Sequence, residues 1–170
     1  MEFNEYTIAK AKYISGLKVK KMPLISWNFY AEHFESLKKT ITDYCQLNLM
    51  AEGNHWNQQW DLKQELQNQT VIVVTCPKLK IIFASQNIHT MNGYKPNEVI
   101  GNSPKMFQGP QTDLTISKQI SQSVKNKQPF DQVVLNYKKD GSLYKCRIKG
   151  FPIFNKKGEL MNFIAFENAA

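Results

Sequence analysis

Arginine, histidine and cysteine, which often take part in catalysis or metal binding, are scarce in this chain. Their scarcity argues against several classes of function. Of 22 basic residues only Arg147 is an arginine, and the chain has three histidines and three cysteines. Cysteines that are widely spaced and odd in number make neither a disulfide framework nor a zinc motif, so we expect reduced thiols. The sequence also lacks a glycine-rich phosphate loop, a nucleophile elbow and an HExxH motif, which argues against an enzyme.

Long apolar runs are absent as well. No stretch approaches the roughly 20 apolar residues that are needed to span a bilayer, so we expect no membrane insertion. The first residues, Met-Glu-Phe-Asn-Glu, lack the basic start and apolar core of a secretory signal peptide. We therefore predict a cytoplasmic protein.

The positive charge is unevenly distributed. Residues 1–70 hold eight lysines and eight acidic residues, whereas residues 71–170 hold 14 basic and six acidic residues and so carry the whole net charge of +8. A basic surface can attract nucleic acid or other anionic partners. However, the lysines are spread along the chain, and arginine, the usual reader of bases, occurs once. We interpret the charge as a soluble, lysine-rich surface and do not expect nucleic-acid binding.

The second part of the chain has the pattern of a sheet interrupted by helices. Short apolar runs at residues 71–74 and 81–84 predict two buried strands. Runs at residues 133–137, 144–149 and 160–166 predict three more, joined by the turn at Asp140-Gly141 and by a turn at residues 155–158. Two strands, a helical middle and three strands indicate an α+β domain with an antiparallel sheet.

The pattern of the first part of the chain, residues 1–68, predicts a helical extension. The pattern predicts a short helix at residues 4–15, a basic linker at residues 18–23, and a longer helix from about Ser26 to Ala51. Asn54 is placed to cap a third helix that leads into the first strand. This third helix would carry the apolar residues Trp56, Trp60, Leu62 and Leu66.

An apolar seam runs along the longer helix at spacings of three and four residues. It consists of Trp27, Tyr30, Phe34, Leu37, Ile41 and Tyr44. Such a seam is typical of a helix that packs against an apolar partner. We expect it either to cover the outer face of the sheet or to form a homodimer to which the sheet contributes, and a separate protein partner is a further alternative. The outer-face residues assigned from the sequence are Phe83, Tyr144, Ile148, Phe163 and Ala165.

The most informative stretch lies in the middle of the chain. Residues 101–113 read Gly-Asn-Ser-Pro-Lys-Met-Phe-Gln-Gly-Pro-Gln-Thr-Asp, and residues 92–101 read Asn-Gly-Tyr-Lys-Pro-Asn-Glu-Val-Ile-Gly. The first resembles the flavin-loop motif of the light-oxygen-voltage branch of the PAS family, and the second resembles a segment of many PAS domains. Segments 71–77, 81–87, 136–142 and 162–167 resemble the PAS strands in the same order. The resemblance implies a PAS domain at residues 69–170, with a five-stranded antiparallel sheet and short helices on one face.

The resemblance also implies which residues would bind a ligand between the sheet and the short helices. The glutamine of the loop and the asparagine of a later strand are kept as Gln108 and Asn136. The other family positions are changed, and they fall on Ser103, Lys105, Cys146 and Glu167. Lys105 keeps the positive charge of the family's arginine but loses its bidentate fork.

These changes bear on the cofactor, whose identity the sequence leaves open. The reactive cysteine of the family falls on Pro104, which has no nucleophile, so no cysteinyl–flavin bond is expected. If Glu167 is ionised it can only accept hydrogen bonds and is costly to bury, which disfavours FMN. Haem is disfavoured because His33 and His55 lie in the extension and His89 on the first helix of the domain.

The function that this resemblance implies is a non-catalytic sensory module of signal transduction. Occupancy of the cavity, or docking of a partner, would shift the packing of the N-terminal helices, which requires different affinities for two states. One alternative is a flavoprotein without the cysteine that responds to light or redox conditions. Another is a PAS domain with a filled core that serves only for protein interaction.

Overall fold

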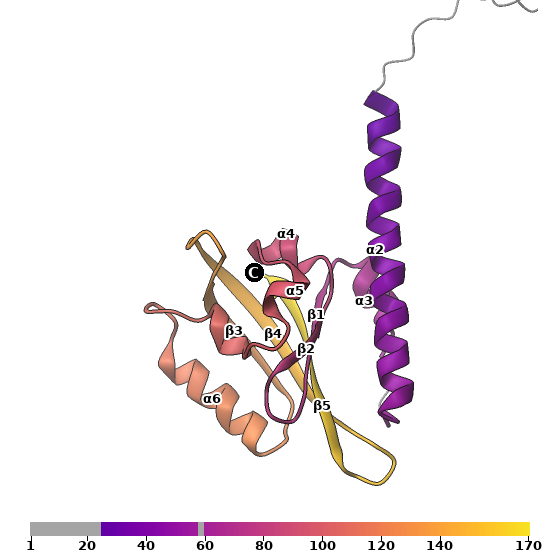
Figure 1. Cartoon of the computed structure of the whole chain (residues 1–170). Helices are drawn as coiled ribbons and strands as arrows, with labels where there is room; N and C mark the ends of the chain where they lie inside the picture. The colour runs from indigo at the N-terminus through magenta and orange to yellow at the C-terminus, as the bar shows by residue number, and fades with distance from the viewer. Residues whose placement is uncertain (1–24, 58–59) are drawn as a thin grey trace, which may run out of the picture. The chain divides into compact units, whose positions relative to one another are not determined.

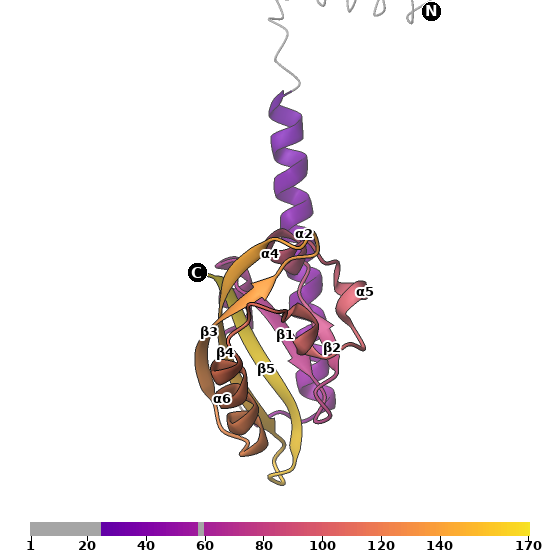
Figure 2. The same cartoon turned by 90° about the vertical axis from the view of Figure 1, so that its left-hand side faces the viewer.

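The fold is built on one five-stranded antiparallel sheet with strand order β2-β1-β5-β4-β3 (Figures 1 and 2). The computed structural model describes residues 25–57 and 60–170, with the backbone alone for residues 25–30 and 32. Residues 37–170 form one compact unit. The helix and linker predicted before residue 24 lie outside the described residues, as do the side chains of Trp27 and Tyr30.

All five predicted strands are present. They are β1 (Val71–Thr75), β2 (Ile81–Ala84), β3 (Phe130–Tyr137), β4 (Leu143–Phe154) and β5 (Leu160–Ala169). The last three are longer than predicted. β4 continues through Gly150 and Pro152, which look like strand breakers in the sequence yet pair with Ala165 and Phe163. Gly150 is needed there, since a Cβ would lie 2.3 Å from the Phe130 ring.

Short helices and α6 cover one side of the sheet, called here the inner face. They are α4 (Ile88–Asn92), α5 (Pro96–Val99), the 3₁₀ helix η1 (Pro104–Phe107) and α6 (Leu114–Lys125). Asp113 caps α6, since its Oδ1 accepts from the backbone N–H groups of Thr115 and Ile116. The α+β fold with helices between the second and third strands is confirmed.

The other side, the outer face, is covered by helices that precede the sheet in sequence. The predicted long helix is confirmed as α2 (Ile25–Gly53). The prediction that the next helix begins at Asn54 is wrong, because α3 spans only Leu62–Gln67. Asp61 caps α3 by accepting a hydrogen bond from the Gln64 N–H at 2.9 Å. Trp56 instead donates its indole N–H to Asn162 Oδ1 at 3.0 Å, so a contact with β5 replaces the first helical turns.

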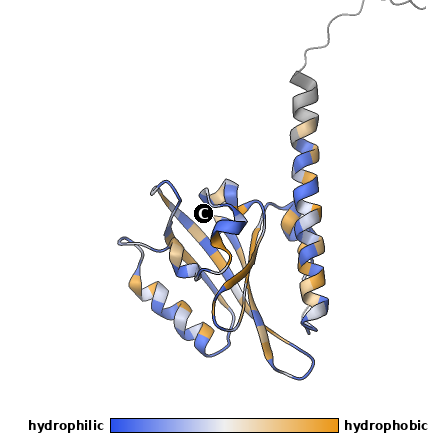
Figure 3. Ribbon diagram, in the orientation of Figure 1, coloured by the Kyte–Doolittle hydropathy of each residue, from blue (hydrophilic) through white to orange (hydrophobic). Residues whose placement is uncertain are grey.

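Strand alternation separates two apolar clusters, and Figure 3 shows apolar residues along the strands. The outer cluster joins residues of α2 and α3 to the sheet: Leu47, Leu62, Leu66, Ile72, Val74, Phe83, Ile153, Ile164 and Phe166. The inner cluster contains Val71, Val73, Ile81, Ala84, Ile88, Val99 and Phe107. The cover on the outer face therefore comes from the same chain, at least from its C-terminal part of α2 and from α3.

The outer-face assignment from the sequence was right for Phe83 and wrong for the other four residues. Ile148, Phe163 and Ala165 line the inner side, and Tyr144 meets Asn92 of α4 there. The reason is strand parity: Phe163 and Ala165 alternate with the outer residues Ile164 and Phe166, so they must face the opposite way.

The apolar seam of α2 is divided between two environments. Tyr44 packs against the outer cluster, and Leu47 one turn later is fully buried. Phe34, Leu37 and Ile41 remain exposed by 66%, 41% and 61%. The seam is therefore only partly an intramolecular cover. No helix in the described part of the chain is long and apolar enough to cross a membrane.

Candidate functional site

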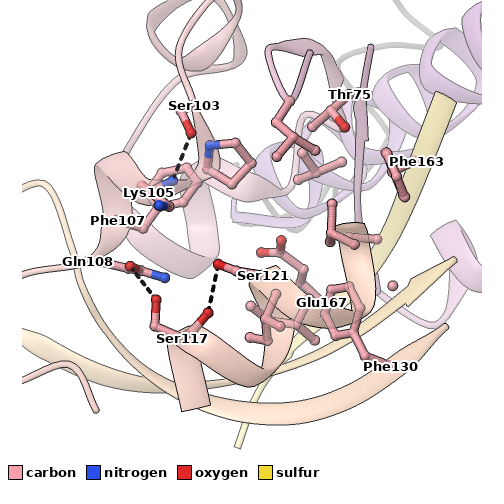
Figure 4. A pocket seen from close by; sticks show the side chains of 18 of the residues that line it. Thr75, Ser103, Lys105, Phe107, Gln108, Ser117, Ser121, Phe130, Phe163 and Glu167 are labelled. Carbon is pink, nitrogen blue, oxygen red and sulfur yellow. Dashed lines mark hydrogen bonds between the residues drawn. The ribbon is translucent and has the colours of Figure 1, made fainter. Parts of the chain in front are cut away.

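A cavity of about 350 Å³ lies between the inner face of the sheet and the segment from η1 to α6 (Figure 4). This volume falls within the range of small-molecule sites. Its apolar wall is formed by side chains from four strands and from α6. Among them are Val73, Ile120, Val124, Phe130, Ile148, Phe163 and Ala165.

The segment around η1 forms the polar rim of the cavity. Ser103 caps η1, because its Oγ accepts from the Lys105 N–H at 3.5 Å. Pro104 is the first residue of η1, a position where a missing N–H costs nothing. Gln108 follows η1, and its Oε1 accepts from the Ser117 hydroxyl of α6 at 3.1 Å. This bond ties the rim to α6, as Figure 4 shows.

Two buried polar atoms on the lining lack a partner in the described part of the chain. They are Oδ1 of Asn136 on β3 and Oγ1 of Thr75 at the end of β1. Their side chains are only 3% and 6% exposed. A buried polar atom without a hydrogen bond costs about 1–3 kcal/mol, so both atoms favour a guest that supplies polar groups.

Glu167 on β5 completes the polar lining. It is 4% exposed, and its Oε2 accepts a hydrogen bond from the Cys146 thiol at 3.7 Å. Burial raises the pKa of the Glu167 carboxyl to about 7, and the bond from Cys146 lowers it by less. Burial also raises the pKa of the Cys146 thiol and of the Tyr144 phenol. Near neutral pH the carboxyl is therefore partly protonated while the thiol and phenol stay neutral.

The structure brings most of the predicted site residues together. Five of the six lie on the cavity lining: Ser103, Lys105, Gln108, Asn136 and Glu167. Pro104, to which the sequence resemblance assigns the family's reactive cysteine, lies there too. Cys146 is not on the lining but behind Glu167, where it donates to the carboxyl. Ligand binding by these residues remains a prediction.

Sequence reasoning missed Thr75, Ser117, Phe130 and Ile148 on the lining. Thr75 could have been found from parity, because it alternates with Val74 of the outer cluster and shares a face with Val73. Ser117 could have been found from helical spacing, because it lies three residues before Ile120 and seven before Val124, both apolar and on the same face.

The residues present fit a flat heterocycle with polar edges. The wall is mostly apolar, Asn136 offers an unused acceptor, and a protonated Glu167 offers a donor. The sequence argument against FMN assumed an ionised Glu167, and the raised pKa removes much of that cost. His89 is exposed and not on the lining. Among the residues that the structure describes, no group of His, Cys, Asp or Glu could hold a metal ion.

Comparison with known proteins points to one family. A family model for the PAS domain matches residues 69–168. Phototropin-2 of Oryza sativa subsp. japonica is 36% identical over 111 residues, which are 63% of this chain and 12% of the phototropin. A blue-light-activated histidine kinase of Brucella anthropi is 32% identical over 97 residues, which are 55% of this chain and 20% of the kinase. This chain thus spans a fifth or less of either relative.

Solved structures have the same fold. A light-oxygen-voltage domain whose mechanism was studied with a flavin analogue is 27% identical, with a TM-score of 0.61. The match covers 66% of this chain and 86% of that domain. The dark structure of the Aureochrome1 light-oxygen-voltage domain, at 24% identity and a TM-score of 0.60, shows the likeness of fold alone.

Proposed function

The chain belongs to the PAS domain family, and from this premise we propose that it is a non-catalytic sensor that binds a flavin without a covalent bond. The observation that carries the proposal is the apolar cavity with two unpartnered buried polar atoms, Asn136 Oδ1 and Thr75 Oγ1. A core filled by its own side chains would leave no such cavity, so the ligand-free alternative is less well supported. A flavin is favoured over other heterocycles by the similarity to the light-oxygen-voltage domain that was studied with a flavin analogue.

A bound flavin would supply light absorption and electron uptake, and this chain's residues would hold and orient it. Asn136 and Glu167 would face its polar edge, and Gln108 would do so from the rim. Lys105, which is exposed on the rim, would attract the phosphate of FMN as a point charge. Pro104 cannot form the covalent bond of the family's cysteine.

We further propose that β5 transmits occupancy of the cavity to α2 and α3. Ala165 and Glu167 line the cavity, whereas Ile164 and Phe166 also belong to the outer cluster with Leu47 of α2. Because successive side chains of one strand face opposite ways, a shift of β5 toward a ligand moves the surface on which α2 packs. Such a shift carries a signal if the ligand prefers one of the two packings.

Two further parts of the proposal concern the surroundings of the protein. We propose a homodimer through the exposed seam residues Phe34, Leu37 and Ile41 of α2, since 41–66% of each side chain is exposed. We also propose a cytoplasmic location. The division into an extension (residues 1–68) and a PAS domain (residues 69–170) is part of the same proposal.

The visible absorption spectrum of the purified chain tests the ligand. Addition of FMN or riboflavin to the protein, followed by removal of unbound ligand, should leave a band near 450 nm. Asn136→Leu should weaken the binding, because it removes the unused acceptor. A wild-type protein that retains no flavin, together with a cavity that also rejects other heterocycles, would support the ligand-free interaction domain instead.

A further inference from the structure

Glu167 is an unusual residue for this cavity because its side chain is 4% exposed and lies on a mostly apolar wall, where an ionised carboxylate is poorly solvated. Its Oε2 accepts from the Cys146 thiol, and no hydrogen bond reaches its Oε1 in the described part of the chain. A buried carboxylate without a cation is expensive, whereas the protonated acid is not. The proton therefore belongs on Oε1, the oxygen that Cys146 does not occupy.

Among Glu167 and the ionisable groups around it, Glu167 is the one whose charge changes near neutral pH. Cys146 and Tyr144 approach from β4, and burial holds the pKa of each above its usual range, so both stay neutral. Lys105 of η1 is the other ionisable residue on the lining, and it is exposed.

The remaining neighbours of Glu167 are uncharged. Its partners across the strands are Val71 of β1 and Ile148 of β4. α6 contributes Ser117, Ile120, Ser121 and Val124 to the lining. No strand or helix on the lining therefore places a buried cation against the carboxylate.

On the basis of the proposed flavin site, we propose that the cavity takes up its ligand together with a proton on Glu167, which donates to an acceptor of the ligand. Protonated Glu167 gives the wall a donor, and Asn136 Oδ1 gives it an acceptor. This pair matches a ring edge on which a carbonyl or ring nitrogen lies beside an N–H. Ionised Glu167 would offer acceptors only, and these repel the ligand's carbonyl. Binding then weakens as Glu167 loses its proton.

The experiment measures the affinity for riboflavin from about pH 6 to about pH 9 by the quenching of its fluorescence. Riboflavin is chosen because it lacks the phosphate of FMN, which itself titrates near neutral pH, as phosphate monoesters do with a pKa of about 6. If only the protonated form binds, the affinity of the wild type falls by up to about 100-fold across this range. Glu167→Gln keeps a donor without a titrating proton, so its affinity should stay flat.

Cys146→Ala is a second variant, for which we predict the direction in which the pH of the fall in affinity moves. The thiol stabilises ionised Glu167, so its removal should move the fall in affinity to higher pH. Lys105→Met is the matched control: it removes the rim cation, and it should leave the pH dependence of riboflavin binding in place. Circular dichroism verifies that each variant is folded.

Two results overturn the inference while leaving the flavin site standing: an affinity of the wild type that does not change with pH, or a slope in Glu167→Gln equal to that of the wild type. If riboflavin fails to bind at every pH, the proposed flavin function fails instead. The proton on Glu167 is then followed in the ligand-free chain by ¹³C NMR of the carboxyl. Loss of the proton near the usual pKa of 4.5 overturns the inference, and its retention to near pH 7 supports it.

Discussion

At the scale of single residues, the buried carboxyl of Glu167 makes a prediction about stability. The folded state holds its proton more tightly than the unfolded chain does, because burial raises the pKa from 4.5 to about 7. The free energy of unfolding should therefore fall as pH rises from about 4.5 to about 7, by up to about 3 kcal/mol, and stay low above that. Glu167→Gln should be more stable than the wild type at about pH 8 and gain little at about pH 4.

Urea unfolding of both proteins at several pH values measures this difference. Some pH dependence will remain in Glu167→Gln, because burial also raises the pKa of Asp43 to about 6, against the bond from the Gln86 N–H. A variant whose stability tracks the wild type in parallel from about pH 4 to about pH 8 would mean that Glu167 ionises freely in the folded protein.

Pro104 makes a second prediction, about photochemistry. It lies on the cavity lining and has no thiol, and the sequence resemblance assigns the family's reactive cysteine to this position. Blue light should therefore produce no cysteinyl–flavin species in the wild type loaded with flavin. The measurement is the absorption spectrum before and after illumination. Reversible bleaching to a single band near 390 nm would contradict the prediction and would direct attention to Cys146.

The site residues that could be predicted from the sequence are those on strands or in the loop motif. Gln108, Asn136 and Glu167 could be placed because the register of the family motif points all three inward, although strand parity was misjudged for Phe163 and Ala165 beside Glu167. The position of Cys146 behind Glu167 could not be predicted, since both face inward and only their packing decides which one meets the cavity. The unpartnered atoms of Thr75 and Asn136 also need coordinates, because a sequence does not show which hydrogen bonds are missing.

At the scale of elements, the contact between α2 and the sheet makes a third prediction. Leu47 is fully buried in the outer cluster, whereas Leu49 on the same helix is 69% exposed. Leu47→Ala should lower the free energy of unfolding by about 2–5 kcal/mol, as deletions of buried leucine side chains do. Leu49→Ala is the matched control and should change it by less than about 0.5 kcal/mol. Chemical denaturation measures both.

Equal effects of the two substitutions would show that α2 does not pack on the sheet through Leu47.

The same substitution tests the proposed coupling. If β5 couples the cavity to α2, Leu47→Ala should also alter the affinity for riboflavin, although Leu47 is not on the lining. Leu49→Ala should leave that affinity unchanged.

Elements were predictable where local pattern and tertiary contact agree. The strands β1 and β2 follow from short apolar runs, and α2 follows from its apolar repeat. The start of α3 was missed because Trp56 hydrogen-bonds to Asn162, a residue 106 positions away. The extension of β4 past Pro152 was missed because pairing with β5 overrides the usual effect of proline.

At the scale of the whole molecule, the uncovered part of the α2 seam is the feature that the packing of the described residues does not explain. Leu37 and Ile41 are 41% and 61% exposed at a spacing of four, and Phe34 precedes them by three. The same repeat continues into Tyr44, which the chain buries against its own sheet. A second copy of the helix would bury the exposed positions in the manner of a short coiled coil. An isolated seam of this length is weak, so a stable dimer would need contacts outside the seam as well.

The last prediction follows from this division of the seam. Light scattering should show a dimer for the wild type and a folded monomer for Leu37→Asp combined with Ile41→Asp, because each introduced charge would be buried without a partner in the dimer. Lys38→Asp, at an exposed position next to Leu37 but off the seam, should leave the dimer intact. Both variants should unfold at nearly the wild-type denaturant concentration when measured as monomers, since neither touches the outer cluster. If the wild type is monomeric and the double variant is unchanged in mass and stability, the seam is exposed to solvent and the proposed dimer is wrong.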